Sequence, residues 1–225
     1  MNAQGKRSGE TAREYAYRMI REQVISLELK PGEAFNDMEF AAKIGVSRTP
    51  VREAVIQLSE ESRIIEIFPQ RGMRIAPIDV ELVEEARSLR VLLEKQIAGM
   101  CCEMATEEDI KWLQENVGLQ EFYMENSRPE MVMQLDDEMH HKLFMICHRE
   151  LTYGMCQKLA IHYDRIRSLS VNTVKDNTII EDHRKIIQFI AEHKKENAMA
   201  QMEKHLSRWQ LKEGKFRQEF PDYFK

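Results

Sequence analysis

The stretch KIGVSRTPVREAV, residues 43–55, decides the fold of the first third of the chain. Gly45 can adopt the left-handed conformation that ends many helices. Ser47 is a favoured residue for the N-cap of the following helix, and Pro50 falls in the first turn, where its missing N–H costs little. The stretch therefore predicts a tight turn between two helices.

The helix that starts at Ser47 has two different faces. Its apolar residues recur at helical spacing and are expected to point inward: Val51, Ala54, Val55 and Leu58. Arg48 and Arg52 lie four residues apart on another face, with Thr49 near the helix start. A recognition helix places its N-terminal residues against base edges, and arginine can make a forked contact with guanine.

The flanking segments complete a known order of elements. A helical pattern precedes the stretch: Tyr15, Met19, Ile20, Val24 and Leu27. Asn36 or Asp37 can cap a short helix that runs to Lys43. After it, RIIEIF (63–68) and GMRIAPI (72–78) alternate like two strands joined by a PQRG turn. Helix, helix, turn, helix and hairpin form a winged helix-turn-helix.

Charge alone does not indicate DNA binding. Residues 1–76 contain 12 Lys+Arg and 11 Asp+Glu, and residues 77–225 contain 21 and 27, within a net charge of -5. The first segment is thus no basic tail that coats DNA, and any contact must come from a few placed cations. Two arginines alone are more often ordinary solvated residues, but the cap, the proline, the turn and the hairpin together favour DNA.

LKPGEAFNDMEFAAKIGVSRTPVREAVIQL, residues 29–58, resembles the DNA-binding domain of the GntR family of bacterial transcription regulators. The resemblance covers about residues 11–76. It implies operator contacts by Arg48, Thr49 and Arg52, with Ser47 on a phosphate and Gly72 at the tip of the wing; Arg71 can reach the flanking groove or backbone. Ser62-Arg63 stands where the family usually has Gly-Leu, and Met38 where some members have arginine.

The pattern of the sequence changes near residues 68–79, with a boundary at about 76–79, which predicts a DNA-binding domain at 1–76 and a second domain at 77–225. The second part predicts an all-α bundle of six helices, at roughly 79–103, 107–126, 129–148, 151–171, 177–194 and 197–218. The fold class is mainly α. No run of about 18 apolar residues and no secretory signal occurs, so a cytoplasmic location is expected. The four cysteines predict reduced, mostly buried thiols.

Four residues in the second part can share a metal ion. Asp136 and His140 lie at i and i+4 on one helix face. His183 lies on an isoleucine-rich face, and His205 follows Met202 at an inward position. One carboxylate and three imidazoles suit Zn²⁺ first, with Ni²⁺ and Mn²⁺ as alternatives. On spacing alone, separate core histidines are the more frequent explanation.

LDDEMH (135–140), EDHRKI (181–186) and MEKHL (202–206) look like the three signature segments of the FCD ligand-binding domain, found in the FadR subfamily of GntR regulators. The resemblance implies that Asp136, His140, His183 and His205 bind the metal. It also makes Arg90, in RVLLE, a candidate for the carboxylate of a bound acid. Six helices resemble the shorter, VanR-like branch.

These resemblances imply a homodimeric repressor that binds double-stranded operator DNA and responds to a small organic or sugar acid, with no membrane partner. Two alternatives remain open on the residues. The first is a metalloenzyme that carries a DNA-binding module, although no HExxH and no clear general base is present. The second is a regulator whose metal is only structural.

Overall fold

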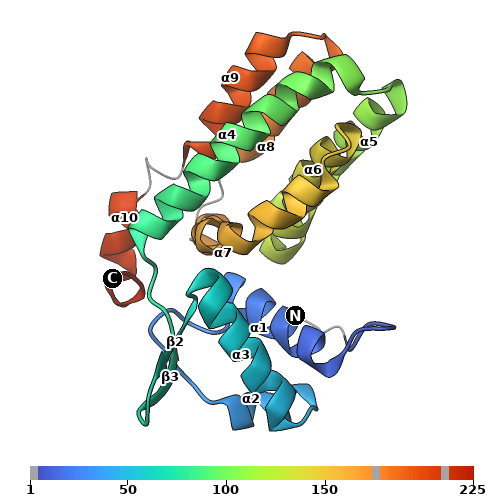
Figure 1. The fold of residues 1–225 in the computed structure, drawn as a ribbon. Coiled ribbons are helices and arrows are strands. Elements are labelled where there is room, and N and C mark those ends of the chain that lie inside the picture. The colour runs from blue at the N-terminus through green and yellow to red at the C-terminus, as the bar shows by residue number, and fades with distance from the viewer. Residues whose placement is uncertain (1–4, 174–177, 209–212) are drawn as a thin grey trace. The chain divides into compact units, whose positions relative to one another are not determined.

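The computed structural model describes residues 5–173, 178–208 and 213–225 (Figure 1). Its regular elements follow in chain order: α1 Ala12–Ile25, β1 Ala34–Phe35, α2 Asp37–Ile44, α3 Arg48–Ser62, β2 Ile65–Phe68, β3 Gly72–Ile75, α4 Val80–Met104, α5 Glu107–Glu125, α6 Pro129–Ile146, α7 Glu150–Thr173, α8 Thr178–Ala191, α9 Lys195–Leu206 and α10 Glu213–Glu219. The mainly helical fold with a small winged sheet confirms the fold class expected from the sequence.

Local sequence signals position the three N-terminal helices. Thr11 and Glu14 form a capping box at the start of α1, and Asn36 caps α2 by accepting hydrogen bonds from the N–H groups of Met38 and Glu39. Gly45 ends α2 with φ 73°. Ser47 occupies the N-cap position of α3, but its side chain makes no capping hydrogen bond.

The wing contains a strand that the sequence did not indicate. β2 and β3 pair as the expected antiparallel hairpin, with Phe68 opposite Gly72. The two-residue strand β1 adds to the other edge of β3, which gives the order β1-β3-β2. A strand of two residues has no detectable alternation, so only the pairing itself reveals it.

Residues 217–225 group with the winged-helix unit, which comprises residues up to Val80, and Glu81–Phe216 form the second unit. The expected boundary at 76/77 placed residues 217–225 in the helical domain. The structure differs because Phe224 forms a parallel bridge with Ile78. The N–H of Ile78 donates to the carbonyl of Tyr223 (2.7 Å), and the N–H of Lys225 donates to the carbonyl of Ile78 (3.0 Å).

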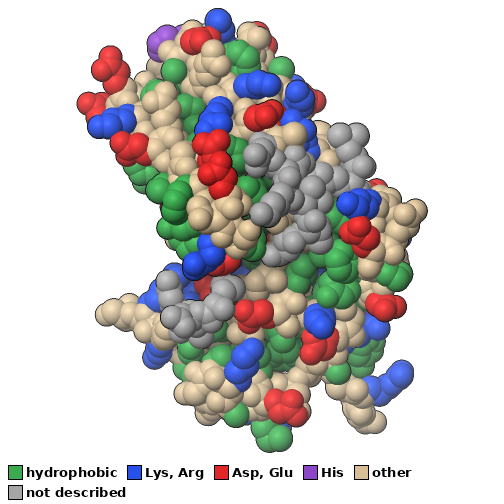
Figure 2. Space-filling model, turned by 180° about the vertical axis from the view of Figure 1, so that it is seen from behind, with side chains coloured by type: hydrophobic (Ala, Val, Ile, Leu, Met, Phe, Trp, Pro, Cys, Tyr) green, Lys and Arg blue, Asp and Glu red, His purple; other side chains and the backbone are tan. Residues whose placement is uncertain are grey.

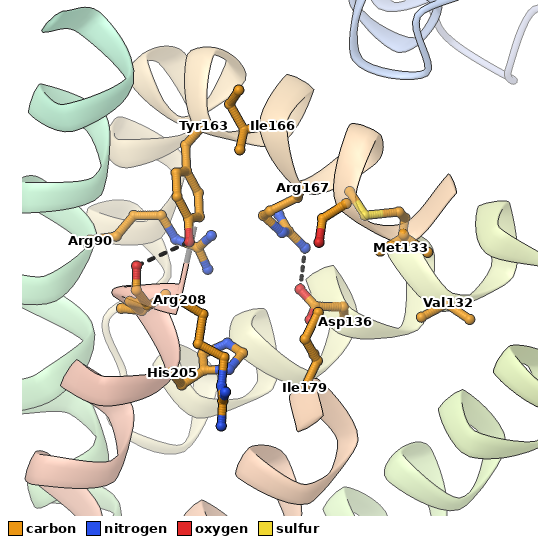
Figure 3. A pocket seen from close by; sticks show the side chains of 13 residues that line it. Arg90, Val132, Met133, Asp136, Tyr163, Ile166, Arg167, Ile179, His205 and Arg208 are labelled. Carbon is orange, nitrogen blue, oxygen red and sulfur yellow. Dashed lines mark hydrogen bonds and ion pairs between the residues drawn. The ribbon is translucent and has the colours of Figure 1, made fainter. Parts of the chain in front are cut away.

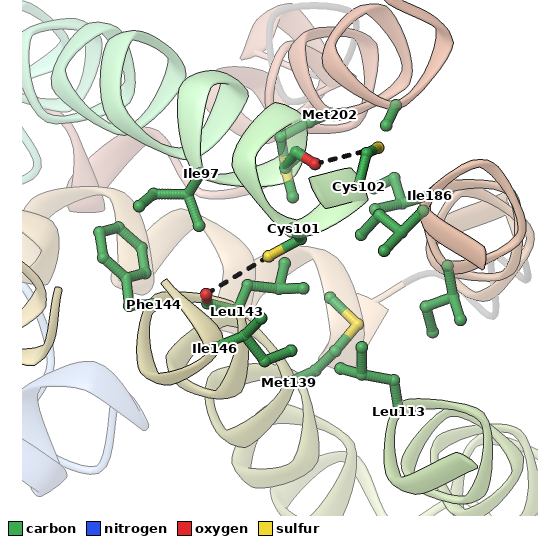
Figure 4. Close-up of a cluster of buried hydrophobic side chains, with 14 of the residues drawn as sticks. Ile97, Cys101, Cys102, Leu113, Met139, Leu143, Phe144, Ile146, Ile186 and Met202 are labelled. Carbon is green, nitrogen blue, oxygen red and sulfur yellow. Dashed lines mark hydrogen bonds between the residues drawn. The ribbon is translucent and has the colours of Figure 1, made fainter. Parts of the chain in front are cut away.

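The second unit is a helical bundle in which α5 packs on α6 and α8, α6 on α7, and α8 on α9. Its core combines aliphatic side chains with three buried thiols (Figure 4). Cys101 donates to the carbonyl of Leu143, and its Sγ lies 3.5 Å from Sγ of Cys147. α4 approaches α9 closely at Gly99, where an added Cβ would lie 2.9 Å from Sδ of Met199.

The last predicted helix, 197–218, includes residues 209–212, which lie outside the described residues. α9 ends at Leu206, and α10 begins at Glu213. Ser207 follows α9 as its C-cap, and its hydroxyl donates to the carbonyl of Glu203 (2.8 Å). A serine hydroxyl bonded to a backbone carbonyl competes with continuation of the helix. In the described part of the chain, the six helices α4 to α9 make the bundle, and α10 is a further helix.

Figure 2 shows basic and acidic side chains interspersed over the face of the molecule that it presents. Among the described residues, no helix is both long enough and apolar enough to cross a membrane.

Arg63 offers a test of how α3 ends. It takes φ 55° at the C-cap, a left-handed conformation that disfavours a residue with a Cβ. We expect Arg63→Gly to raise the free energy of unfolding of the winged-helix unit by about 0.5–1 kcal/mol, after allowance for the greater backbone freedom of glycine. Urea denaturation followed by circular dichroism measures the change. Arg63→Ala keeps the Cβ and should give no gain; equal effects of the two substitutions would contradict the explanation.

Candidate functional site

The start of α3 presents the residues expected to contact DNA. Ser47, Arg48, Thr49 and Arg52 are all exposed there. Arg71 lies in the exposed turn of the wing, and Gly72 begins β3 with φ 99°. Met38, at the start of α2, is 60% exposed, so it leaves an apolar side chain where some members of the family have arginine.

Asp37 contacts the two arginines of α3, a role that no sequence signal indicated. Its carboxylate is buried, and Oδ1 accepts a hydrogen bond from Nε of Arg48 at 3.0 Å. Oδ2 lies 3.8 Å from Nη1 of Arg52. Because Asn36 caps α2, the Asp37 side chain is available for this contact. Both guanidinium groups remain more than half exposed.

The second unit brings Asp136, His140, His183 and His205 together. Each offers one ligand atom, and these four atoms lie within 4.8 Å of one another. The four side chains are buried and come from α6, α8 and α9. Nε2 of His183 lies 3.4 Å from Oδ1 of Asp136 and 3.3 Å from Nε2 of His205. His141, the next residue of α6, stacks on Tyr153 instead.

The protonation states suit a metal site. Burial lowers the pKa of His183 to about 4 and the pKa of His205 well below its ordinary value. Both imidazoles are therefore neutral near pH 7, which is the form that binds a metal. Burial alone would raise the pKa of the Asp136 carboxyl, but the guanidinium of Arg167 lowers it overall. Asp136 is thus ionised, the form in which a carboxylate can bind a cation.

Asp136 also belongs to an ion-pair cluster with α7. The guanidinium of Arg167 pairs with Asp136, with Asp137 (2.8 Å) and with Asp164 (2.7 Å). Arg167 thereby compensates part of the negative charge that burial of these carboxylates creates. The sequence signals gave no indication of Arg167, because its partners come from α6 as well as from its own helix.

Each of the three histidines has a further polar group beside its Nδ1. Nδ1 of His140 pairs with Glu94 of α4, and Nδ1 of His183 lies 2.9 Å from Oε1 of Gln120 on α5. Nδ1 of His205 lies 3.9 Å from Oδ2 of Asp182, beyond hydrogen-bond distance. Sequence spacing did not reveal these neighbours, since they are distant in the chain.

Arg90 lies in the same region and is buried. Its Nε donates to Oε1 of Glu94 at 2.5 Å, and its guanidinium lies over the ring of Tyr163 at 5.3 Å. The hydroxyl of Tyr163 in turn donates to the carbonyl of Leu206 (3.0 Å). Arg90 is therefore already braced by protein groups, in addition to any role that it has towards a ligand.

A cavity of about 50 Å³ adjoins this cluster. Its wall includes Asp136 and His205, three arginines (Arg90, Arg167 and Arg208) and apolar side chains such as Ile166, Ile179 and Leu206. Figure 3 shows Arg90 and Arg208 with His205 on one side, and Arg167 bonded to Asp136 on the other. The space suffices for a few water molecules or a small ligand.

The donor set fits a divalent ion. Nε2 of His140 is buried and has no hydrogen-bond partner among the described residues, although it lies 3.7 Å from Oδ2 of Asp136. Such an atom is normally satisfied, and a cation would satisfy it. Three imidazole nitrogens and one carboxylate match the ligands preferred by Zn²⁺ and related ions.

Known protein families match both halves of the chain. The model of the bacterial regulatory proteins of the gntR family matches residues 12–75, and the model of the FCD domain matches residues 85–208. The HTH-type transcriptional repressor RspR of Escherichia coli K12 is 28% identical over 92% of this chain and 91% of its own length. The Nta operon transcriptional regulator of Aminobacter aminovorans is 26% identical over 82% and 86%.

Solved structures support the fold. E. coli McbR/YncC superposes with a TM-score of 0.75 at 18% identity, covering 93% of this chain and 99% of that one. A GntR regulator from Rhodococcus sp. RHA1 gives a TM-score of 0.71 at 16% identity, covering 87% and 94%. The relatives are named as regulators, so the metalloenzyme alternative is set aside. The chain belongs to the GntR family of bacterial helix-turn-helix transcriptional regulators and carries an FCD domain.

Proposed function

We propose that this regulator is a homodimeric repressor whose affinity for operator DNA is controlled by a small carboxylate bound at a metal site in the FCD domain. The observation that carries the proposal is the convergence of Asp136, His140, His183 and His205 beside a cavity lined by arginines. FCD domains often bind metals, and a relative over most of the chain is named a repressor. Action on operator DNA implies a cytoplasmic location.

The DNA contact follows from the geometry of α3. Asp37 accepts a hydrogen bond from Arg48 and lies 3.8 Å from Arg52, and both guanidinium groups project from the exposed start of the helix. A positioned, exposed arginine can donate two parallel hydrogen bonds to guanine in the major groove. Two such units in a dimer would read a pseudo-palindrome. Ser47 and Thr49 then contact the backbone and bases nearby, and Arg71 and Gly72 place the wing on the flanking DNA.

The acid would bind beside the ion. Zn²⁺, Ni²⁺ and Mn²⁺ can each bind more than four ligands, so an ion held by four protein residues can accept a further one. A carboxylate oxygen is a suitable further ligand. Arg90, which lines the same cavity, is the candidate for a second carboxylate contact. Ile166, Ile179 and Leu206 supply apolar wall for a short carbon skeleton. The cavity volume of about 50 Å³ favours a small acid.

The central experiment measures operator affinity in three states of the purified protein: metal-free, loaded with Zn²⁺, and loaded with Zn²⁺ in the presence of individual organic and sugar acids. An operator is first obtained by in vitro selection. We expect one acid to weaken operator binding about 5–150-fold, the range of a 1–3 kcal/mol coupling. If every acid leaves operator affinity and thermal stability unchanged, the metal is structural. If an acid tightens binding, the protein is not an acid-released repressor.

Arg52→Ala tests the DNA-binding helix. Loss of a base contact should weaken operator binding by roughly 1–3 kcal/mol and relax the preference at one base pair. Fluorescence anisotropy on the selected operator and on single-base variants measures both effects. Arg13→Ala, an exposed arginine of α1, controls for the loss of one positive charge. Equal weakening on all sequences would make Arg52 a phosphate contact.

His140→Ala tests the metal site. The substitution removes a ligand, so Zn²⁺ affinity should fall by more than the roughly 10–100-fold that loss of a ligand's hydrogen-bond partner causes. Competition with a chromogenic chelator and elemental analysis measure the effect. His141→Ala changes the next residue of α6, which stacks on Tyr153, and should leave affinity unchanged. Full metal occupancy in the His140→Ala protein would exclude His140 from the site.

A further inference from the structure

We infer that Gln120 of α5 and Glu94 of α4 are positioning residues for the metal site: they hold His183 and His140 protonated at Nδ1 and turn the lone pair of each Nε2 towards the shared ligand position. The inference rests on the metal site proposed above. It assigns roles to two buried polar residues outside the set of ligands.

The contact of Gln120 determines the tautomer of His183. Gln120 is fully buried, and its Nε2 donates to Oδ1 of Asn116 at 2.7 Å. That bond leaves the amide oxygen as the group that faces Nδ1 of His183, at 2.9 Å. An amide oxygen only accepts, so Nδ1 of His183 carries the proton. Nε2 therefore has its lone pair free, and it lies 3.4 Å from Asp136.

Glu94 lies behind His140 as Gln120 lies behind His183. Oε1 of Glu94 accepts from Nε of Arg90 at 2.5 Å, and Oε2 contacts Nδ1 of His140 as an ion pair without hydrogen-bond geometry. An ionised carboxylate only accepts, which favours a proton on Nδ1 of His140. Nε2 of the same ring then presents a lone pair near Oδ2 of Asp136. A carboxylate behind a metal-binding histidine is a common way to orient the ring and raise its basicity.

His205 differs from the other two histidines. Because Nε2 of His183 is unprotonated, a hydrogen bond across the 3.3 Å contact between the two Nε2 atoms places the proton on Nε2 of His205. Nδ1 of His205 has no hydrogen-bond partner among the described residues, with Asp182 3.9 Å away. This proton lies between two nitrogens that would both bind the ion. Metal binding by His205 therefore requires this proton to leave Nε2. If the ring takes up a proton at Nδ1 instead, that proton faces Asp182.

Imidazole ¹⁵N chemical shifts of the metal-free, full-length protein test the tautomers directly, with signals assigned from single His→Ala variants. We expect His183 and His140 to be protonated at Nδ1 and His205 at Nε2. Addition of Zn²⁺ should move the His205 proton to Nδ1. Protonation of His183 or His140 at Nε2 in the metal-free protein would overturn the inference.

Zn²⁺ affinity, measured by chelator competition, tests the consequence. Gln120→Leu removes the acceptor and should weaken binding about 10–100-fold, whereas Gln120→Glu keeps an acceptor and should restore most of the affinity. Glu94→Leu should likewise weaken binding, and Glu94→Gln should weaken it less. Gln114→Leu, at an exposed position of α5, and Glu103→Gln, at an exposed position of α4, are the matched controls.

The two proposals fail in different ways. If the wild-type protein binds no Zn²⁺, the proposed metal-dependent function fails, while the ¹⁵N shifts still report the tautomers. If the wild-type protein binds Zn²⁺ but Gln120→Leu and Glu94→Leu bind it as tightly as their controls, the positioning roles are wrong and the metal site stands.

Discussion

The helical unit buries a carboxylate and three imidazoles, and its structure depends on the polar partners that offset the free-energy cost of removing them from water. Burial of an ionised carboxylate costs several kcal/mol unless partners offset it. Asp136 has Arg167 and the histidines as partners, and His183 and His140 have Gln120 and Glu94. These groups come from α4, α5, α6, α7 and α8, with His205 from α9. Their compensation therefore constrains the whole bundle, while the aliphatic core supplies the close packing around it (Figure 4).

The buried carboxylate of Glu94 links the two proposed ligands, the metal ion and the small acid. Arg90 lines the cavity and binds Glu94, and Glu94 pairs with His140. An acid at Arg90 and an ion at His140 would therefore share one buried carboxylate as a neighbour. In the winged-helix unit, Asp37 has a comparable role: one buried carboxylate orients two exposed arginines. In both places, one buried carboxylate lies behind two basic side chains: Glu94 behind Arg90 and His140, and Asp37 behind Arg48 and Arg52.

Local signals predicted much of the fold and part of the site. The cap at Asn36 and the left-handed Gly45 each depend on neighbours within a few residues, and the structure has them. The i, i+4 spacing also paired Asp136 with His140. The contacts of Gln120 with His183, of Asp37 with Arg48 and of β1 with β3 did not follow from the sequence, because tertiary packing alone creates them.

The bridge between Ile78 and Phe224 makes the DNA-reading half a discontinuous domain, assembled from both ends of the described chain. Ile78 is completely buried, and both of its backbone polar groups are satisfied by residues 223–225. A fragment cut after residue 80 would expose that isoleucine and leave its N–H and carbonyl to solvent. Excised versions of this half therefore need the distal peptide restored, for instance by circular permutation or by adding it in trans.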